Sequence, residues 1–401
     1  MIDRPLNPWW MVAAGALGTS VGAGIFAVYS LGVFVAPISA DLGWNRSILA
    51  ACITIFLFST GLGTVWLGRL ISRFGLRKPS ALFLAIYVAT VAAIALLPAV
   101  PLLFYLNFFV MGIAGAAACP MPYAVAICGF FDQRRGLALG IMMLGAGLGA
   151  MLSPQLSAYL LNAFGWRTAL LLIAAIAAVP ILGIIVWLRN PPHTAPGETS
   201  AQGAPAQSYL RSREFYLIAG AVAGNSVAAV GIMTSIVPLA TDRGISMTEA
   251  ATMLSVAGAA AFAGRLIVGW LFDKLFAPYV GATVFILAAI GALLIAWGGG
   301  GLTSYIGAGL VGTCLGAEAD FVSFMVSRYF STALFSRVVG AMWVAWAWGG
   351  GIGTYLAGLS YDWTGSYVNA FIGFVALLIL SAVLLLRMPP YFHAHGNAAA
   401  H

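Results

Sequence analysis

The stretch GRLISRFGLRK, residues Gly68–Lys78, decides how the rest of this chain is interpreted. A shorter echo of it, GWLFDK, begins 201 residues later at Gly269–Lys274. Each stretch follows one long apolar segment and precedes another, so each is predicted to be a tight polar hairpin between two membrane helices. Because the hairpin returns after half of the chain, we expect two copies of one helical bundle.

The composition restricts the class of protein. Hydrophobic residues make up 62% of the 401 residues, and charged residues make up 7%. A water-soluble globule of this composition would expose one continuous apolar patch, so the chain is predicted to lie in a lipid bilayer. The net charge of +7 comes from basic residues in the loops, where they set orientation, and nucleic-acid binding is not expected.

Twelve apolar segments are long enough to span a membrane. The first is too long for a signal-peptide core and is predicted to be a mature helix. The expected organisation is a six-helix bundle at 1–189, a Pro- and Gly-rich cytoplasmic linker at 190–212, a second six-helix bundle at 213–387 and a cytoplasmic tail at 388–401. The twelve segments are 9–38, 46–69, 79–98, 101–129, 136–161, 167–189, 214–240, 247–271, 279–298, 301–327, 338–361 and 367–387.

Residues at corresponding places in the two halves are separated by 199 to 201 positions. Several coincidences at one offset, spread over a whole half, indicate a duplication whose repeats have parallel orientation. The matching pairs are Pro37 and Pro238, Asp41 and Asp242, Gly43 and Gly244, Gly68 and Gly269, Phe130 and Tyr329, and Gly165 and Gly365.

The basic residues predict the orientation in the membrane. Fourteen Lys and Arg residues lie at one set of helix ends and three, Arg46, Arg167 and Arg243, at the other. Basic loops stay in the cytoplasm, so both termini and the linker are predicted to be cytoplasmic. The expected location is the inner membrane of a bacterial-type cell. On the opposite side, Asn45 and Ser246 are expected to cap the helices that follow them.

The hairpin at Gly68 resembles the signature loop between helices two and three of the major facilitator superfamily. That loop has Gly, two variable residues, a small residue, Asp, a basic residue, an aromatic residue, Gly and further basic residues. Here Ser72 replaces the usual Asp, whereas the second copy keeps an acid. The resemblance implies an all-α fold of twelve transmembrane helices in two six-helix bundles. It also implies a gating latch formed by Gly68, Arg69, Arg73, Arg77, Gly269, Asp273 and Lys274.

Within the superfamily, the chain is most similar to the monocarboxylate transporters and the related oxalate:formate antiporter group. Asn107 stands where drug antiporters usually carry an Arg, which disfavours that branch. The similar segments are GVFVAPISADLGWNRSILA from Gly32, FFDQRRGLALGIMMLGAGLGA from Phe130, FGWRTALL from Phe164 and LAGLSYDWTGSYVNAF from Leu356.

Only Arg265, Glu318 and Asp320 are ionisable residues well inside the apolar segments. A charge there is costly unless it is paired or faces water, so each is a functional candidate. Helical rise places all three roughly 12 to 15 Å from the cytoplasmic ends. The guanidinium fork of Arg265 fits a carboxylate, and the resemblance agrees, because Arg265 stands where related transporters carry a substrate-linked Arg. The alternative is a permanent brace between Arg265 and one carboxyl.

Glu318 and Asp320 are two residues apart, so they point about 200° away from each other around a helix. One of them is expected to neutralise Arg265, and a desolvated one to carry a coupling proton, because desolvation favours a protonated carboxyl; Glu318 is preferred to Asp320 as the proton carrier. The oxalate exchangers carry a Lys in span eleven, where this chain has MWVAWAWGGG, so one Arg without a Lys predicts a substrate with one carboxylate.

Further residues are expected in the substrate pocket, although packing is an alternative for each of them. Gly145, Gly147 and Gly149, and Gly349 to Gly353, are expected to pack the halves closely together. The aromatic residues favour a substrate with an apolar or aromatic remainder. The predicted pocket residues are Tyr29, Tyr123, Leu144, Asn225, Ser226, Ser323, Trp343 and Trp346.

The predicted function is secondary active transport of a monocarboxylate with a proton, by alternating access of a monomer. Proton-independent exchange of carboxylates is the alternative, and uncoupled transport is also open. A channel, or a sensor with the transporter fold that moves no substrate, is a less favoured interpretation. An enzyme is not expected, because the sequence has no nucleophile elbow or phosphate-binding loop. Neither a cofactor nor a metal is expected, and the four cysteines lack metal-ligand spacing.

Overall fold

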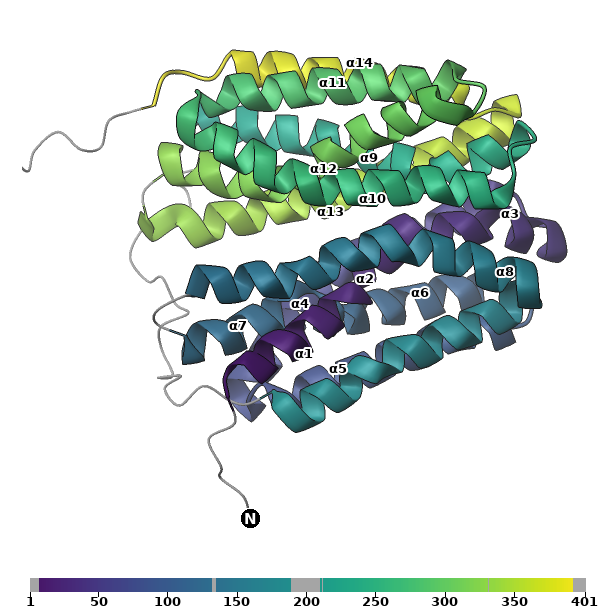
Figure 1. Cartoon of the computed structure of the whole chain (residues 1–401), viewed down its shortest axis with the longest axis horizontal. Helices are drawn as coiled ribbons and strands as arrows, with labels where there is room; N and C mark the ends of the chain where they lie inside the picture. Colours follow the sequence, from purple (N-terminus) through teal and green to yellow (C-terminus); the bar gives the residue numbers. More distant parts are fainter. Residues whose placement is uncertain (1–6, 132–134, 189–209, 211, 331, 392–401) are drawn as a thin grey trace, which may run out of the picture.

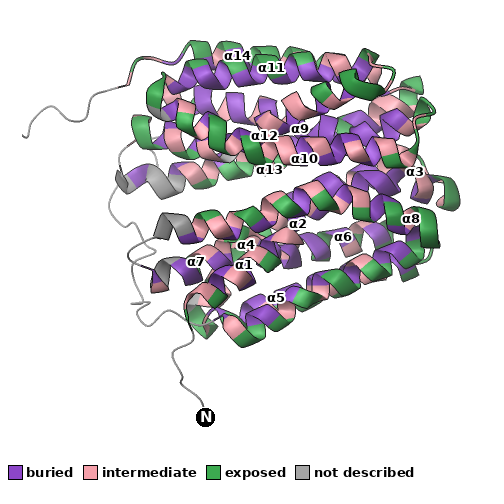
Figure 2. Cartoon of the chain, viewed as in Figure 1, coloured by how far each residue is buried: buried purple, intermediate pink, exposed green. Residues whose placement is uncertain are grey.

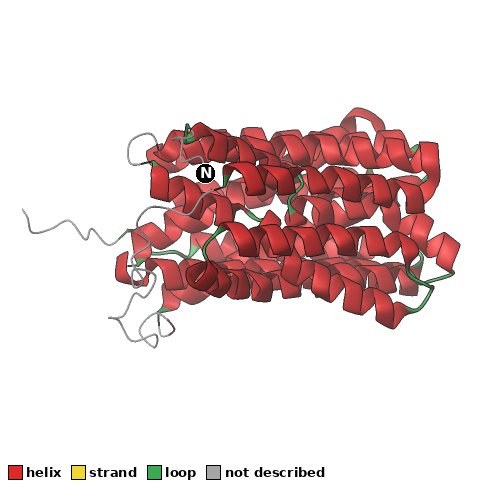
Figure 3. Ribbon diagram, turned by 90° about the horizontal axis from the view of Figure 1, so that it is seen from below, coloured by secondary structure: helices red, strands yellow, loops and turns green. Residues whose placement is uncertain are grey.

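The computed structural model describes residues 7–131, 135–188, 210, 212–330 and 332–391. The described residues form helices joined by short loops, without strands (Figure 3). The first half contains α1 (Trp9–Ser20), α2 (Ala23–Ile25), the π-helical turn η1 (Phe26–Ser30), α3 (Leu31–Leu42), α4 (Arg46–Phe74), α5 (Arg77–Leu96), α6 (Pro101–Gly115), the 3₁₀ turn η2 (Ala116–Ala118), α7 (Pro120–Phe130) and α8 (Arg135–Trp187). The second half contains α9 (Arg213–Asp242), α10 (Met247–Lys274), α11 (Ala277–Trp297), α12 (Gly301–Tyr329), α13 (Thr332–Thr364) and α14 (Val368–Leu386).

These elements make the twelve predicted spans. α1, α2, η1 and α3 together form one bent span, and α6, η2 and α7 form another. α8 contains two spans, because Gly165 adopts a left-handed conformation (φ 73°) that breaks it into two arms. Nine stretches of the described residues are long and apolar enough to cross a membrane, or ten when the two parts of α12, which meet at 42°, are counted as one.

The helices form two bundles, α1–α8 and α9–α14, which lie side by side (Figure 1). The duplication is visible in the turns, since Gly43 and Gly244 both have positive φ, as do Gly165 and Gly365. The predicted linker and tail lie almost entirely outside the described residues, so the domain boundaries stay a prediction. Figure 2 shows exposed residues along the outer sides of α5, α11 and α14, where apolar side chains would meet lipid.

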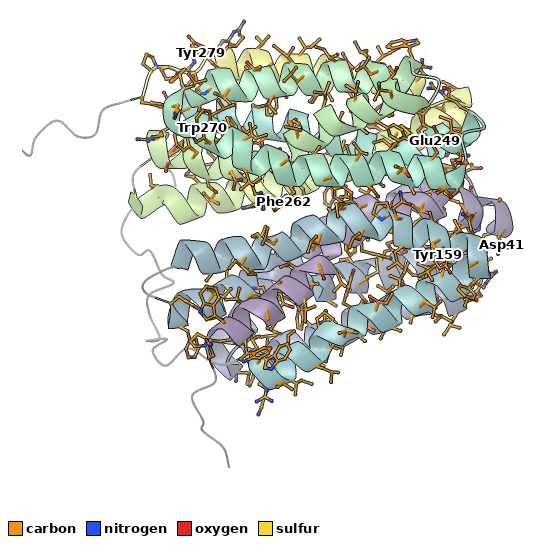
Figure 4. The ribbon with its side chains drawn as sticks, viewed as in Figure 1. Asp41, Tyr159, Glu249, Phe262, Trp270 and Tyr279 are labelled. Carbon is orange, nitrogen blue, oxygen red and sulfur yellow. The ribbon has the colours of Figure 1, made fainter. Side chains whose placement is uncertain are left out.

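The ribbons of the two bundles approach each other at one end of the molecule and diverge towards the end where α1 begins (Figure 1). We call the first of these the closed end. It comprises Asp41–Arg46, Asp242–Met247 and Thr364–Tyr367. Asp41 and Glu249 mark this end in Figure 4.

Polar and aromatic contacts join the bundles on the way from the closed end to the middle. Thr54 Oγ1 donates to the carbonyl of Gly351 (2.7 Å), and Gln155 Nε2 donates to Thr252 Oγ1 (2.7 Å). The ring of Phe58 on α4 stacks on that of Trp348 on α13, with centroids 5.2 Å apart. α4 therefore lies against α13, and α8 against α10.

The glycine prediction is correct about close packing but partly wrong about which helices meet. A Cβ at Gly145 would overlap the carbonyl oxygen of Ala16, and one at Gly353 would overlap that of Val227. Both approaches occur inside a bundle, between α8 and α1 and between α13 and α9. Gly147 does face the other half, because a Cβ there would lie 2.7 Å from the ring of Phe262.

The two predicted helix caps differ in outcome. Ser246 caps α10 as expected, since its side chain accepts a hydrogen bond from the Glu249 backbone N–H (3.2 Å). The prediction for Asn45 is wrong, because its side chain makes no capping hydrogen bond to α4. Asp362 supplies that cap from the other bundle, since its carboxylate accepts from the backbone N–H groups of Arg46 and Ser47 (both 3.1 Å).

Candidate functional site

Arg265 on α10 and Asp320 on α12 form an ion pair between two adjacent helices. Arg265 Nε lies 3.3 Å from Asp320 Oδ2, and it also donates to the backbone carbonyl of Gly316 (3.3 Å). α10 and α12 pack closely here, since a Cβ at Gly316 would overlap the main chain of Ala261. The glycine therefore lets the guanidinium reach the backbone of α12.

The pair is partly open to its surroundings. Arg265 keeps 30% and Asp320 keeps 41% of its side-chain surface exposed. The two terminal nitrogens of the guanidinium donate no hydrogen bond to the described residues, so they can bind a further acceptor. A planar carboxylate matches those two nitrogens in size and charge.

Tyr29 is a residue of the first bundle that lies near the Arg265–Asp320 pair. It lies in η1, and it is close enough to Arg265 for an electrostatic interaction between the two side chains. π-helical turns inside α-helices are frequent at functional sites, because they redirect a side chain. The site therefore joins α10 and α12 of the second half to the first span of the first half.

Glu318 belongs to a separate, buried cluster on the other side of α12. Its side chain is 3% exposed, and its Oε2 accepts a hydrogen bond from Trp346 Nε1 (2.8 Å). Cys314 Sγ donates to Asn225 Oδ1 (3.0 Å), and Asn225 also faces the Glu318 carboxyl. Glu318 Oε1 and Asn225 Nδ2 have no hydrogen-bond partner among the described residues. The two carboxyls thus point to different sides, as the helical positions predict.

Several other predicted pocket residues lie near these two groups. Ser226 Oγ donates to the backbone carbonyl of Trp346 (2.6 Å), which holds α9 against α13. Trp343 packs edge-on against Trp346, with centroids 5.5 Å apart, and is itself 44% exposed. Ser323 is exposed one turn after Asp320 on α12.

Tyr123 and Leu144 lie elsewhere in the first bundle. Tyr123 is fully buried against Gly18 of α1, and its hydroxyl has no hydrogen-bond partner in the described part of the chain. Leu144 lines an apolar cavity of about 540 Å³ between α1, α5 and the two arms of α8, together with Ser30 and Tyr87. Their place in the substrate pocket stays a prediction.

The predicted gating loops lie at the end opposite the closed end. Lys274 Nζ lies 4.1 Å from the centroid of the Trp270 ring, and Arg73 Cζ lies 5.2 Å from that of Phe74. The side chains of Ser72 and Asp273 are outside the described part of the chain, so the latch between the loops stays a prediction. Gly68, Arg69, Arg77 and Gly269 lie on the same helix ends.

Sequence reasoning missed two neighbours of the site. Phe262 lies one turn before Arg265 on α10, and Figure 4 shows it on the side of α10 that faces α8. The sequence could have indicated Phe262, because residues three apart on a helix lie on the same face. The carbonyl of Gly316 was not predictable, because a backbone acceptor leaves no residue-type signal.

The chain belongs to the Major Facilitator Superfamily, whose family model matches residues 16–354. It is therefore a membrane transporter of that type and not an enzyme. Monocarboxylate transporter 13 of Bos taurus is 26% identical over 402 residues, which cover 97% of this chain and 92% of the relative. An uncharacterized MFS-type transporter of Bacillus subtilis (strain 168), YcxA, is 24% identical over 386 residues, covering 94% of each chain.

A solved structure supports the fold independently. The bacterial homologue of the human lysosomal transporter Spinster, in an inward-facing and occupied conformation, superposes with a TM-score of 0.71 at 18% identity. The match covers 95% of this chain and 97% of that one. At this level of identity the likeness supports the twelve-helix fold alone.

Proposed function

We propose that the chain transports a monocarboxylate together with a proton, by alternating access of its two bundles. The observation that carries the proposal is the Arg265–Asp320 pair, in which one internal carboxylate holds a guanidinium whose terminal nitrogens are available. A substrate carboxylate would compete with Asp320 for the charge of Arg265.

Protonation of Asp320 provides the coupling in this proposal. A neutral Asp320 no longer competes for Arg265, so a proton and a substrate anion bind better together than either does alone. The loaded carrier then has the same net charge as the empty one, because a proton and a monoanion cancel. Glu318 is the second candidate for the proton, since its carboxyl is buried away from Arg265.

The proposed substrate class follows from one Arg and the aromatic residues around it. Arg265 is the only cation well inside the apolar spans, so one carboxylate can be neutralised there. Tyr29 and Phe262 offer aromatic surface nearby, and the exposed Trp343 lies beside the Glu318 cluster; this aromatic content favours an apolar or aromatic remainder. The similarity to a protein named monocarboxylate transporter 13 supports this class.

The test is uptake of radiolabelled carboxylates into proteoliposomes, with and without an inward proton gradient. The panel contains short aliphatic, branched and aromatic monocarboxylates, with a dicarboxylate as a control. We expect the gradient to accumulate a monocarboxylate. Asp320→Asn should abolish accumulation but keep exchange, whereas Glu318→Gln should keep both.

Other outcomes would redirect the proposal. Loss of the proton drive in Glu318→Gln alone would move the proton site to Glu318. Accumulation that ignores the gradient and requires a trapped internal anion would make the protein an exchanger, in which Asp320 only balances Arg265. Transport of the dicarboxylate in preference to every monocarboxylate would overturn the substrate class.

A further inference from the structure

Arg46 joins the two bundles at the closed end. It is the first residue of α4, and its Nη1 and Nη2 donate to Asp242 Oδ2 (2.6 Å) and Oδ1 (2.5 Å) at the end of α9. Its Cζ lies 3.8 Å from the centroid of the Tyr361 ring, and Nη1 lies 3.3 Å from the Tyr367 hydroxyl. The guanidinium side chain is 12% exposed. Two parallel hydrogen bonds, an aromatic face and partial burial distinguish this pair from a weak surface ion pair.

A second acid makes the same connection through the backbone. The carboxylate of Asp362, on α13 of the second bundle, accepts from the N–H groups of Arg46 and Ser47 in the first bundle. These N–H groups have no partner within α4, and a carboxylate at a helix N-terminus is favoured by the helix dipole. When the bundles separate at this end, the bond to Asp242 and the cap of α4 are both lost.

The duplication explains why Asp242 pairs with the other bundle whereas the corresponding Asp41 does not. In the first half, Asp41 pairs with Arg167 of its own bundle (2.7 Å). The offset of 200 residues that relates Gly165 to Gly365 places Tyr367 where Arg167 stands in the first half. Asp242 therefore has no cation from its own bundle among the described residues, and it takes Arg46 from the other bundle.

We infer that Arg46, Asp242 and Asp362, here called the Arg46 lock, hold the closed end shut and must separate before the transporter opens there. The Asp41–Arg167 pair remains intact during this movement, because both partners belong to one bundle. The inference requires that the two bundles move apart at the closed end, but it does not depend on the substrate or on the proton.

The test measures the distance across the closed end by double electron–electron resonance in proteoliposomes. Spin labels at Asn162→Cys on α8 and Thr248→Cys on α10 report it, because both positions are exposed and belong to different bundles. The four native cysteines are replaced beforehand. Arg46→Gln and Asp242→Asn should each increase the ratio of open to closed molecules by about tenfold, which is equivalent to about 1.4 kcal/mol. Asp362→Asn should shift the ratio in the same direction.

Arg167→Gln is the matched control, and it should leave the distance distribution unchanged. Size-exclusion profiles and melting temperatures identify variants that do not fold, and the three lock variants provide independent measurements. An unchanged distribution in all three, or an equal shift in Arg167→Gln, would overturn the inference. Neither result would affect the proposed transport function, which the uptake assay tests separately.

Discussion

At the scale of single residues, the chemistry of the site depends on how one guanidinium is shared. The Nε of Arg265 is occupied by Asp320 and by the backbone of Gly316, whereas its terminal nitrogens donate no hydrogen bond within the described part of the chain. This arrangement fixes the orientation of the guanidinium but uses only its Nε. A substrate carboxylate can then gain two parallel hydrogen bonds that Asp320 does not make.

The substitution Arg265→Lys keeps the charge but removes the fork. An ammonium is a compact point charge that cannot bind a carboxylate through two parallel hydrogen bonds, so we expect the apparent affinity for the substrate to fall by about tenfold or more. Uptake kinetics in proteoliposomes measure this change. Arg167→Lys, far from the site, is the control and should behave like the unaltered protein. Equal affinity in Arg265→Lys and the unaltered protein would remove Arg265 from substrate binding.

At the scale of helices, a sequence pattern predicts a helix cap only when the capping residue is next to that helix in the chain. Ser246 caps its own helix, and the pattern in the sequence is sufficient to find it. α4 has Asn45 at the corresponding place, but Asp362, more than 300 residues away in the chain, satisfies its N–H groups. A contact of this kind depends on the docking of the two bundles, which no window of sequence contains.

Ser246→Ala should destabilise the protein more than Asn45→Ala. Loss of a helix cap typically costs about 1 kcal/mol, and Ser246 makes its capping bond whereas Asn45 makes none. Thermal unfolding in detergent, followed by tryptophan fluorescence, compares the two variants under one condition. A larger decrease in melting temperature for Asn45→Ala would show that the observed cap assignment is wrong.

The twelve spans were predictable because each is long, apolar and followed by a polar turn. The site was predictable in part. The depth of the three charges and the angle between Glu318 and Asp320 indicated that only one carboxyl meets Arg265, but helical geometry did not show which one. Tyr123 and Leu144 were placed from their positions along the chain; Tyr123 is buried against Gly18 and Leu144 lines an apolar cavity, so their role in the pocket stays a prediction.

At the scale of the whole molecule, alternating access requires contact surfaces that fit closely in one state and separate in the other. Gly147 on α8 lies in such a surface, because the ring of Phe262 on α10 occupies the space in which a Cβ would stand. The two bundles can approach this closely only where one helix lacks a side chain.

Gly147→Val should therefore disfavour the conformation in which α8 and α10 are in contact, and it should slow transport. Overpacking at a close contact typically costs about 1 to 3 kcal/mol. Gly140→Val on the same helix is the control, because a Cβ there has open space. Combining Gly147→Val with Phe262→Ala should restore part of the rate by making room. If Gly147→Val transports at the normal rate, the close contact does not matter for the cycle.

The central claim is that a proton and a monocarboxylate cross the membrane together, without net charge. The most direct measurement is the accumulation of the substrate in proteoliposomes under a fixed proton gradient, with a potassium diffusion potential of about 100 mV imposed in either direction. Movement of one net charge would couple to about 2.3 kcal/mol, or roughly a fifty-fold change in accumulation. Our account predicts that accumulation follows the proton gradient and is independent of the potential. Accumulation that follows the potential, or that persists without a proton gradient, would contradict it.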